Sequence, residues 1–151
     1  MKTIFSTIAM AMIPVIELRG AIPFGVAAGL TVTQAMFFSI IGNLIPIPFI
    51  LFFLRRVFQL MRKMSPRLES VVEKLEAKAK SKQEIIDKYE WIGLVILVAI
   101  PLPGTGGWTG ALVATVLDMR IKRAFPAIVI GVTIAGILVS VITYGGLSIF
   151  S

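Results

Sequence analysis

Two charged side chains, Glu17 and Arg19, lie between the uncharged segments 3–16 and 20–54. A charge in the hydrocarbon core of a membrane costs about 2.5–3.5 kcal/mol, so such residues usually face protein, water or a bound partner. A carboxylate that becomes buried or is separated from a neighbouring cation accepts a proton more readily. We therefore predict a substrate or ion site at Glu17, Arg19 and the adjacent Gly20. The alternative is a salt bridge that only stabilises a turn.

A second candidate motif is the uncharged sequence PLPGTGGW at 101–108. Its prolines end one helix, and its glycines allow backbone N–H groups to converge at the start of the next, where the helix dipole favours an anion. The threonine adds a hydroxyl group and the tryptophan an aromatic wall. The alternative is that any tight turn needs proline and glycine. The residues assigned to the site are Pro101, Pro103, Gly104, Thr105, Gly106, Gly107 and Trp108.

Asn43 is a third candidate, because it lies just before Pro46 and Pro48, which interrupt an apolar segment. Unwound backbone inside a membrane is tolerated only where it is buried or lines a cavity. Asn43 therefore either joins the site or makes a hydrogen bond between helices.

The composition predicts an all-α integral membrane protein. The 151 residues are 57% hydrophobic and 15% charged, whereas soluble domains have about 45–50% apolar and about 25% charged residues. The chain has no cysteine and no histidine. Disulfides, thiolate metal sites and histidine-based catalysis are therefore excluded, and we expect no enzyme activity, no metal and no cofactor.

The charges are concentrated in one segment. Residues 55–90 hold 10 basic and 6 acidic side chains, and the net charge of the chain is +7. This placement indicates membrane topology and contact with a lipid bilayer carrying anionic head groups, rather than nucleic acid.

The rest of the chain divides into two similar parts. A spanning helix needs about 20 apolar residues, but only 14 precede the first charged pair, and the glycine-rich motif interrupts the last third in the same way. Each part therefore predicts a re-entrant helical hairpin followed by one transmembrane helix. The predicted bounds are 1–54 for repeat 1 (hairpin 3–32, helix 33–54) and 91–151 for repeat 2 (hairpin 91–117, helix 122–148).

The two repeats are predicted to be inverted. If residues 91–117 simply crossed the membrane, the basic loop 118–123 would lie opposite the basic segment 55–90. Short cytoplasmic loops collect Lys and Arg, so both should lie on the cytoplasmic side. A hairpin at 91–117 meets this condition and places both termini outside. The repeats then form an inverted pair of the kind common among secondary transporters.

The segment 55–90 is predicted to be a cytoplasmic amphipathic helical linker. Ser65 before Pro66 is typical of a helix start, and Ser81 begins a capping-box pattern that predicts a second helix. The linker is either a lipid-surface or gating element, or a connector whose apolar stripe packs on the membrane part.

The segments IELRGAIPFGVAAGL (16–30) and IPLPGTGGWTGALVA (100–114) closely resemble the prokaryotic small multidrug export family, which is related to the DedA/VTT superfamily. The resemblance implies a multi-pass protein of the prokaryotic inner membrane with paired re-entrant hairpins. DedA relatives resemble ion-coupled carriers whose functional carboxylate lies in the first hairpin. Glu17 matches that position, and Pro23 follows it at a longer spacing than in many DedA proteins. The arginine of the second DedA hairpin has no counterpart at 101–107.

Three functions remain open from the sequence. The first is a secondary transporter in which Glu17 exchanges a proton and both hairpin tips bind a small solute near the bilayer midplane. The second is a flippase or scramblase of an anionic lipid, with Arg19 and the glycine amides contacting phosphate. The third is a membrane scaffold. Because two hairpins and two spans can scarcely shield polar tips from lipid, we also expect a homodimer or larger homo-oligomer.

Overall fold

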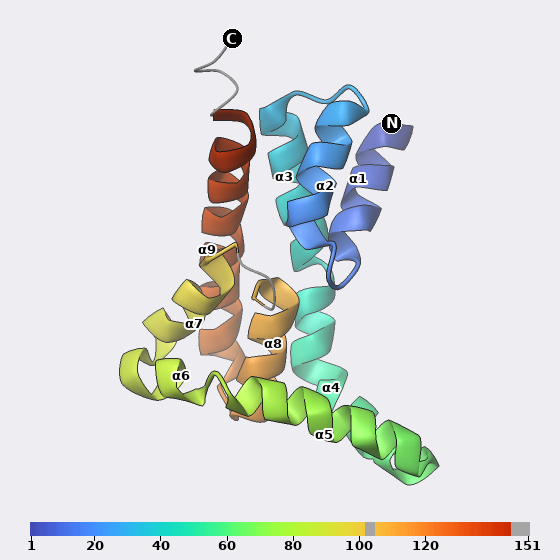
Figure 1. The fold of residues 1–151 in the computed structure, drawn as a ribbon, viewed down its shortest axis with the longest axis vertical. Helices are drawn as coiled ribbons and strands as arrows, with labels where there is room; N and C mark the ends of the chain where they lie inside the picture. Colours follow the sequence, from blue (N-terminus) through green and yellow to red (C-terminus); the bar gives the residue numbers. More distant parts are fainter. Residues whose placement is uncertain (102–104, 146–151) are drawn as a thin grey trace.

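The computed structural model describes residues 1–101 and 105–145, which form α-helices and contain no strand (Figure 1). The all-α prediction is confirmed for this part of the chain. The helices are α1 (Lys2–Met12), α2 (Glu17–Ala27), α3 (Val32–Leu44), α4 (Pro46–Met64), α5 (Pro66–Lys80), α6 (Gln83–Tyr89), α7 (Trp91–Ala99), α8 (Gly107–Val116) and α9 (Ile121–Ser140), followed by a π-helical turn at Val141–Gly145.

Two long helices run along the molecule. Helices α3 and α4 follow each other almost without a break and cover Val32–Met64, which is 33 residues, while α9 and the π-helical turn cover Ile121–Gly145, which is 25 residues. Both are long and apolar enough to cross a membrane. Large apolar side chains are exposed on their outer faces, among them Phe49, Phe52 and Ile137. Such an exterior is typical of a protein surrounded by lipid.

The first long helix extends beyond its predicted end. The helix predicted at 33–54 continues to Met64, so the first residues of the segment 55–90 belong to α4. From Arg55 onwards charged residues are interspersed with apolar ones, so this part of the helix is amphipathic. No helix-breaking residue occurs before Ser65, so the helix continues to Met64. In the second span, residues 146–148 of the predicted range 122–148 lie outside the described residues.

Side-chain caps explain two of the helix starts. The Thr31 hydroxyl accepts a hydrogen bond from the Gln34 amide at 3.1 Å, and the Gln34 side chain accepts one from the Thr31 amide, which completes a capping box. Ser65 caps α5 by accepting from Leu68 N at 3.2 Å. The capping box predicted at Ser81 is wrong. Ser81 directly follows the last residue of α5 and still has helical backbone angles. Its hydroxyl donates a hydrogen bond to the Lys78 carbonyl in α5 and so does not cap α6.

Helices α1 and α2, and helices α7 and α8, form two short hairpins. Helices α1 and α2 have 11 residues each, and α7 and α8 have 9 and 10. At 1.5 Å per residue they are about 14–17 Å long, roughly half of a hydrocarbon core. In Figure 1, α1 descends and α2 rises at the upper end, whereas α7 rises and α8 descends at the lower end, which α5 crosses. The turns of the two hairpins therefore meet near the middle of the molecule.

Substitution of Gly42 is expected to destabilise the upper helices. A Cβ atom at Gly42 would overlap the Ile8 carbonyl oxygen and lie 2.9 Å from the Ala11 Cβ, so α1 would be pushed away from α3. We expect Gly42→Ala to lower the free energy of unfolding by about 1–3 kcal/mol, measured by thermal denaturation in detergent. Ser39→Ala is the matched control on the same helix, because the buried Ser39 hydroxyl has no hydrogen-bond partner among the described residues. Equal stability of the two variants would contradict this packing.

Candidate functional site

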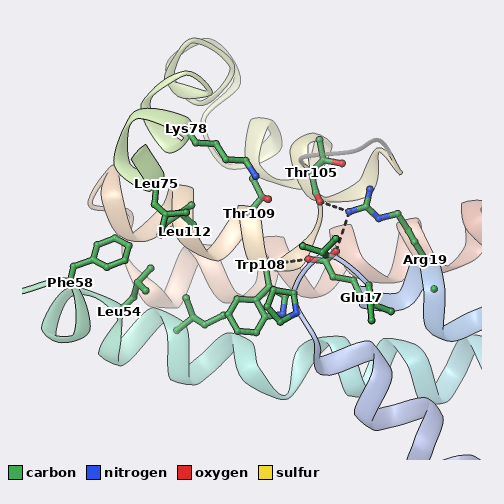
Figure 2. A pocket seen from close by; sticks show the side chains of 15 residues that line it. Glu17, Arg19, Leu54, Phe58, Leu75, Lys78, Thr105, Trp108, Thr109 and Leu112 are labelled. Atoms are coloured by element: carbon green, nitrogen blue, oxygen red, sulfur yellow. Dashed lines mark hydrogen bonds and ion pairs between the residues drawn. The ribbon is translucent and has the colours of Figure 1, made fainter. Parts of the chain in front are cut away.

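The two hairpin turns meet at Glu17, the first residue of α2. Its side chain is buried, and its Oε1 accepts a hydrogen bond of 3.1 Å from the backbone amide of Trp108 in α8. Its Oε2 lies 3.7 Å from the Arg19 Nη2, and the same Nη2 donates a 3.0 Å hydrogen bond to the Thr105 carbonyl. The structure therefore brings Glu17, Arg19, Thr105 and Trp108 together, although they lie far apart in the sequence (Figure 2).

The Glu17 carboxylate occupies the N-terminus of α8. Gly106 is the N-cap of this helix, and the amides of Gly107 and Trp108 both face the carboxylate. Free N–H groups and the helix dipole favour an anion at this position. The sequence predicted that these amides would attract an anion, and the structure shows that the chain's own carboxylate takes this place.

Gly106 has no tolerable replacement in this arrangement. Its φ is 116°, which side-chain-bearing residues rarely adopt, and a Cβ atom there would overlap the Glu17 carboxylate. The opposite turn also has unusual backbone, with φ values of 80° at Val15 and 47° at Glu17. Positive φ at non-glycine residues costs of order 1–3 kcal/mol and is concentrated at functional sites.

Two further hydrogen bonds fix the turns. The Trp108 indole Nε1 donates to the Met12 carbonyl at 3.1 Å, which satisfies the end of α1. The Thr105 hydroxyl donates to the Ile100 carbonyl at 2.6 Å within its own hairpin. Thr105 and Trp108 therefore position the two turns, and both also line the cavity beside the turns.

The other predicted site residues have mixed positions. Asn43 is buried, its Oδ1 has no hydrogen-bond partner among the described residues, and this oxygen faces Gly107, where a Cβ atom would be 3.1 Å away. Gly20 packs on the Ile16 side chain and lines the cavity of about 710 Å³ that is described below. Pro23 lies inside α2 and does not line that cavity. Pro101 borders a small void behind the turns, and Pro103 and Gly104 lie outside the described residues.

A cavity of about 710 Å³ lies beside the turns, on the side that faces α4 and α5 (Figure 2). Cavities of this size that are mostly apolar with a few polar groups commonly hold small molecules. Its large apolar side chains are Val15, Ile16, Ile50, Leu54, Phe58, Leu75, Trp108 and Leu112. Its polar and charged side chains are Glu17, Arg19, Lys78, Thr105 and Thr109.

Sequence reasoning missed the contribution of α5 to this cavity. Leu75 and Lys78 belong to the segment predicted as a linker, yet they form part of the cavity wall. The available signal was the apolar stripe of α5, which includes Leu75. Lys78 lies three residues after Leu75 and therefore on the same helix face as the stripe. Burial of Val72 and Ala79 shows that this stripe packs against the rest of the protein.

A polar cluster near the lower end was also missed. Arg55 of α4 forms an ion pair with Asp118, which precedes α9, and donates a 2.9 Å hydrogen bond to the Thr115 carbonyl at the end of α8. Arg62 pairs with Glu76 of α5 at 2.6 Å. Arg55 and Arg62 therefore connect α4 to α8 and α5, besides any effect on topology.

The fold and the site define an all-helical protein with two membrane-length apolar helices and two short hairpins that enclose a buried carboxylate. A family model described as "Putative small multi-drug export protein" matches residues 17–138, so it includes both turns and the cavity. The chain belongs to this family. No curated protein and no solved structure matches the chain.

Proposed function

We propose that this protein is a small secondary transporter that exports a small solute in exchange for a proton or another ion. The observation that carries the proposal is the buried Glu17 carboxylate at the contact of the two hairpin turns, beside a cavity large enough for a small molecule. Membership of an export-protein family supports the same direction.

The arrangement of the helices supports an inverted pair of repeats. The first group, α1 to α4, runs down, up and down in Figure 1, and the second group, α7 to α9, runs up, down and up. In transporters with inverted repeats the substrate site lies between the repeats near the bilayer midplane. In our proposal the short hairpins are re-entrant, enter from opposite sides and meet at this site, and α5 lies on the cytoplasmic side.

The contacts of Glu17 suggest how coupling works. In the observed state the carboxylate is held by the Trp108 amide and Arg19, which belong to different hairpins. These donors favour the ionised form. If the hairpins separate, the carboxylate loses the Trp108 amide, while Arg19 stays beside it on the same hairpin. Losing this donor removes one contact that favours the ionised form, so protonation and the opening of the turns are linked. The protein then alternates between two states that expose the cavity to opposite sides.

The test of this function is transport by the purified protein in proteoliposomes. An imposed proton gradient is expected to drive movement of a fluorescent amphipathic solute well above the rate in protein-free vesicles. Collapsing the gradient with a protonophore is expected to stop the movement. Equal rates with and without protein, across a panel of solutes and with Na⁺ as well as H⁺ gradients, would contradict the proposal. We also propose that the protein is a homodimer or larger homo-oligomer, which cross-linking in the same vesicles tests.

A further inference from the structure

The charged side chains of the cavity differ in whether they already have partners. Its lining holds one carboxylate, Glu17, and two cations, Arg19 and Lys78. Glu17 already accepts from the Trp108 amide and pairs with Arg19, which itself donates to the Thr105 carbonyl. A cationic ligand would have to displace these donors before it could reach the carboxylate. The cavity is therefore poorly suited to a cation.

Lys78 is differently placed. It projects from α5 toward Thr109 of α8 and borders the cavity (Figure 2). No carboxylate lies within ion-pair distance of its Nζ among residues 1–101 and 105–145. Lys78 interacts electrostatically with Glu17 over a longer distance. The Glu17 carboxylate already has closer contacts with the Trp108 amide and Arg19. Lys78 and the Thr109 hydroxyl thus offer hydrogen-bond donors to the cavity.

The walls next to Lys78 are apolar. Leu75 lies one turn away on α5, and Phe58 and Leu112 face the cavity from α4 and α8. An ammonium group beside a wide apolar surface matches a molecule with an anionic group and a hydrocarbon portion, because the first forms a charge-assisted hydrogen bond and the second is removed from water.

We propose that the cavity binds amphipathic anions and that Lys78 is the residue that selects their charge. This inference rests on the proposed function only in taking the cavity as the solute site. The anion belongs either to a soluble amphiphile or to a lipid with an anionic head group, which present the same chemistry to Lys78.

The test uses quenching of Trp108 fluorescence by brominated amphiphiles, since Trp108 lines the cavity. The protein carries Trp91→Phe, so that Trp108 is its sole tryptophan, and is held in phosphatidylcholine nanodiscs. Bromo-octyl sulfonate, bromo-octyl trimethylammonium and bromo-octanol share one chain and differ in charge. We expect saturable quenching that is strongest for the sulfonate. Lys78→Gln is expected to weaken sulfonate binding about tenfold, the size expected for loss of a charge-assisted hydrogen bond.

Matched variants separate charge selection from general effects. Lys74→Gln removes an exposed lysine one turn away on α5 that does not line the cavity, and is expected to leave sulfonate binding unchanged. Lys78→Glu is expected to favour the trimethylammonium probe. Competition by phosphatidylglycerol in the nanodiscs would identify a lipid as the anion, and its absence a soluble amphiphile; either result supports the charge preference.

Two results would overturn the inference. One is equal or tighter binding of the trimethylammonium probe by the unsubstituted Lys78 protein, and the other is an equal loss of sulfonate binding in the Lys74 and Lys78 variants. Neither result affects the proposed coupling through Glu17. Conversely, sulfonate binding without ion-driven transport in proteoliposomes would contradict the proposed function and leave the charge preference intact.

Discussion

Replacing Glu17 by glutamine is expected to abolish ion-coupled transport while the protein stays folded. Glutamine keeps the side-chain length, and its oxygen can still accept the hydrogen bond from the Trp108 amide. It cannot gain or lose a proton, so movement driven by a proton gradient should fall to the rate of protein-free vesicles. Exchange of labelled for unlabelled solute, which needs no net proton movement, should continue. Both rates are measured in proteoliposomes.

The matched control is Glu84→Gln, which removes an exposed carboxylate on α6. It should transport like the unsubstituted protein. Circular dichroism and gel filtration establish that both variants retain their helices and their oligomeric state. Coupled transport at the normal rate in Glu17→Gln would contradict the role proposed for this carboxylate.

Substitution of Gly106 by alanine is expected to separate the two hairpin turns. The backbone at Gly106, with φ of 116°, strains any residue with a Cβ atom, and the added methyl group would also overlap the Glu17 carboxylate. Together these effects should lower the free energy of unfolding by about 2–4 kcal/mol. Because Glu17 would lose the Trp108 amide, coupled transport should be lost as well. Thermal denaturation and the proteoliposome assay measure the two effects.

Gly29→Ala separates backbone strain from the overlap. Gly29 also has a positive φ, 107°, but a Cβ atom there would meet nothing within 4 Å. This variant should lose only the smaller part of the stability, about 1 kcal/mol, and should transport normally. If Gly29→Ala and Gly106→Ala behave alike in both assays, the contact of Gly106 with Glu17 has no special importance.

Much of the fold follows from where the charges are and where they are missing. The uncharged segments and the short apolar arms before Glu17 indicate long helices and half-length helices before any coordinates are known. Proline and glycine mark the turns, and Ser65 before Pro66 marks a helix start that the structure confirms. Ser81 has a similar pattern but is the C-cap of α5, and Lys82 is the N-cap of α6. A local capping pattern does not show where the preceding amphipathic helix ends.

The site is predictable in part for the same reason. A carboxylate between apolar segments and a turn rich in glycine are each visible in the sequence. Their contact is not, because the hydrogen bond from Trp108 to Glu17 joins residues 91 positions apart. The role of Lys78 is hidden as well. In the sequence it is one of many lysines in a charged segment, and only the packing of α5 beneath the turns places it at the cavity.

Access to the tip of the first hairpin tests the central claim most directly. The chain has no cysteine, so Val15→Cys places a single thiol on an exposed residue that lines the cavity. A membrane-impermeant maleimide is applied to right-side-out and to inverted vesicles, with Lys2→Cys and Lys74→Cys as markers of the two sides. Alternating access predicts that each marker is labelled from one side only, whereas Val15→Cys is labelled from both, with a balance that shifts with the imposed proton gradient. Labelling of Val15→Cys from a single side, unchanged by the gradient, would contradict the account.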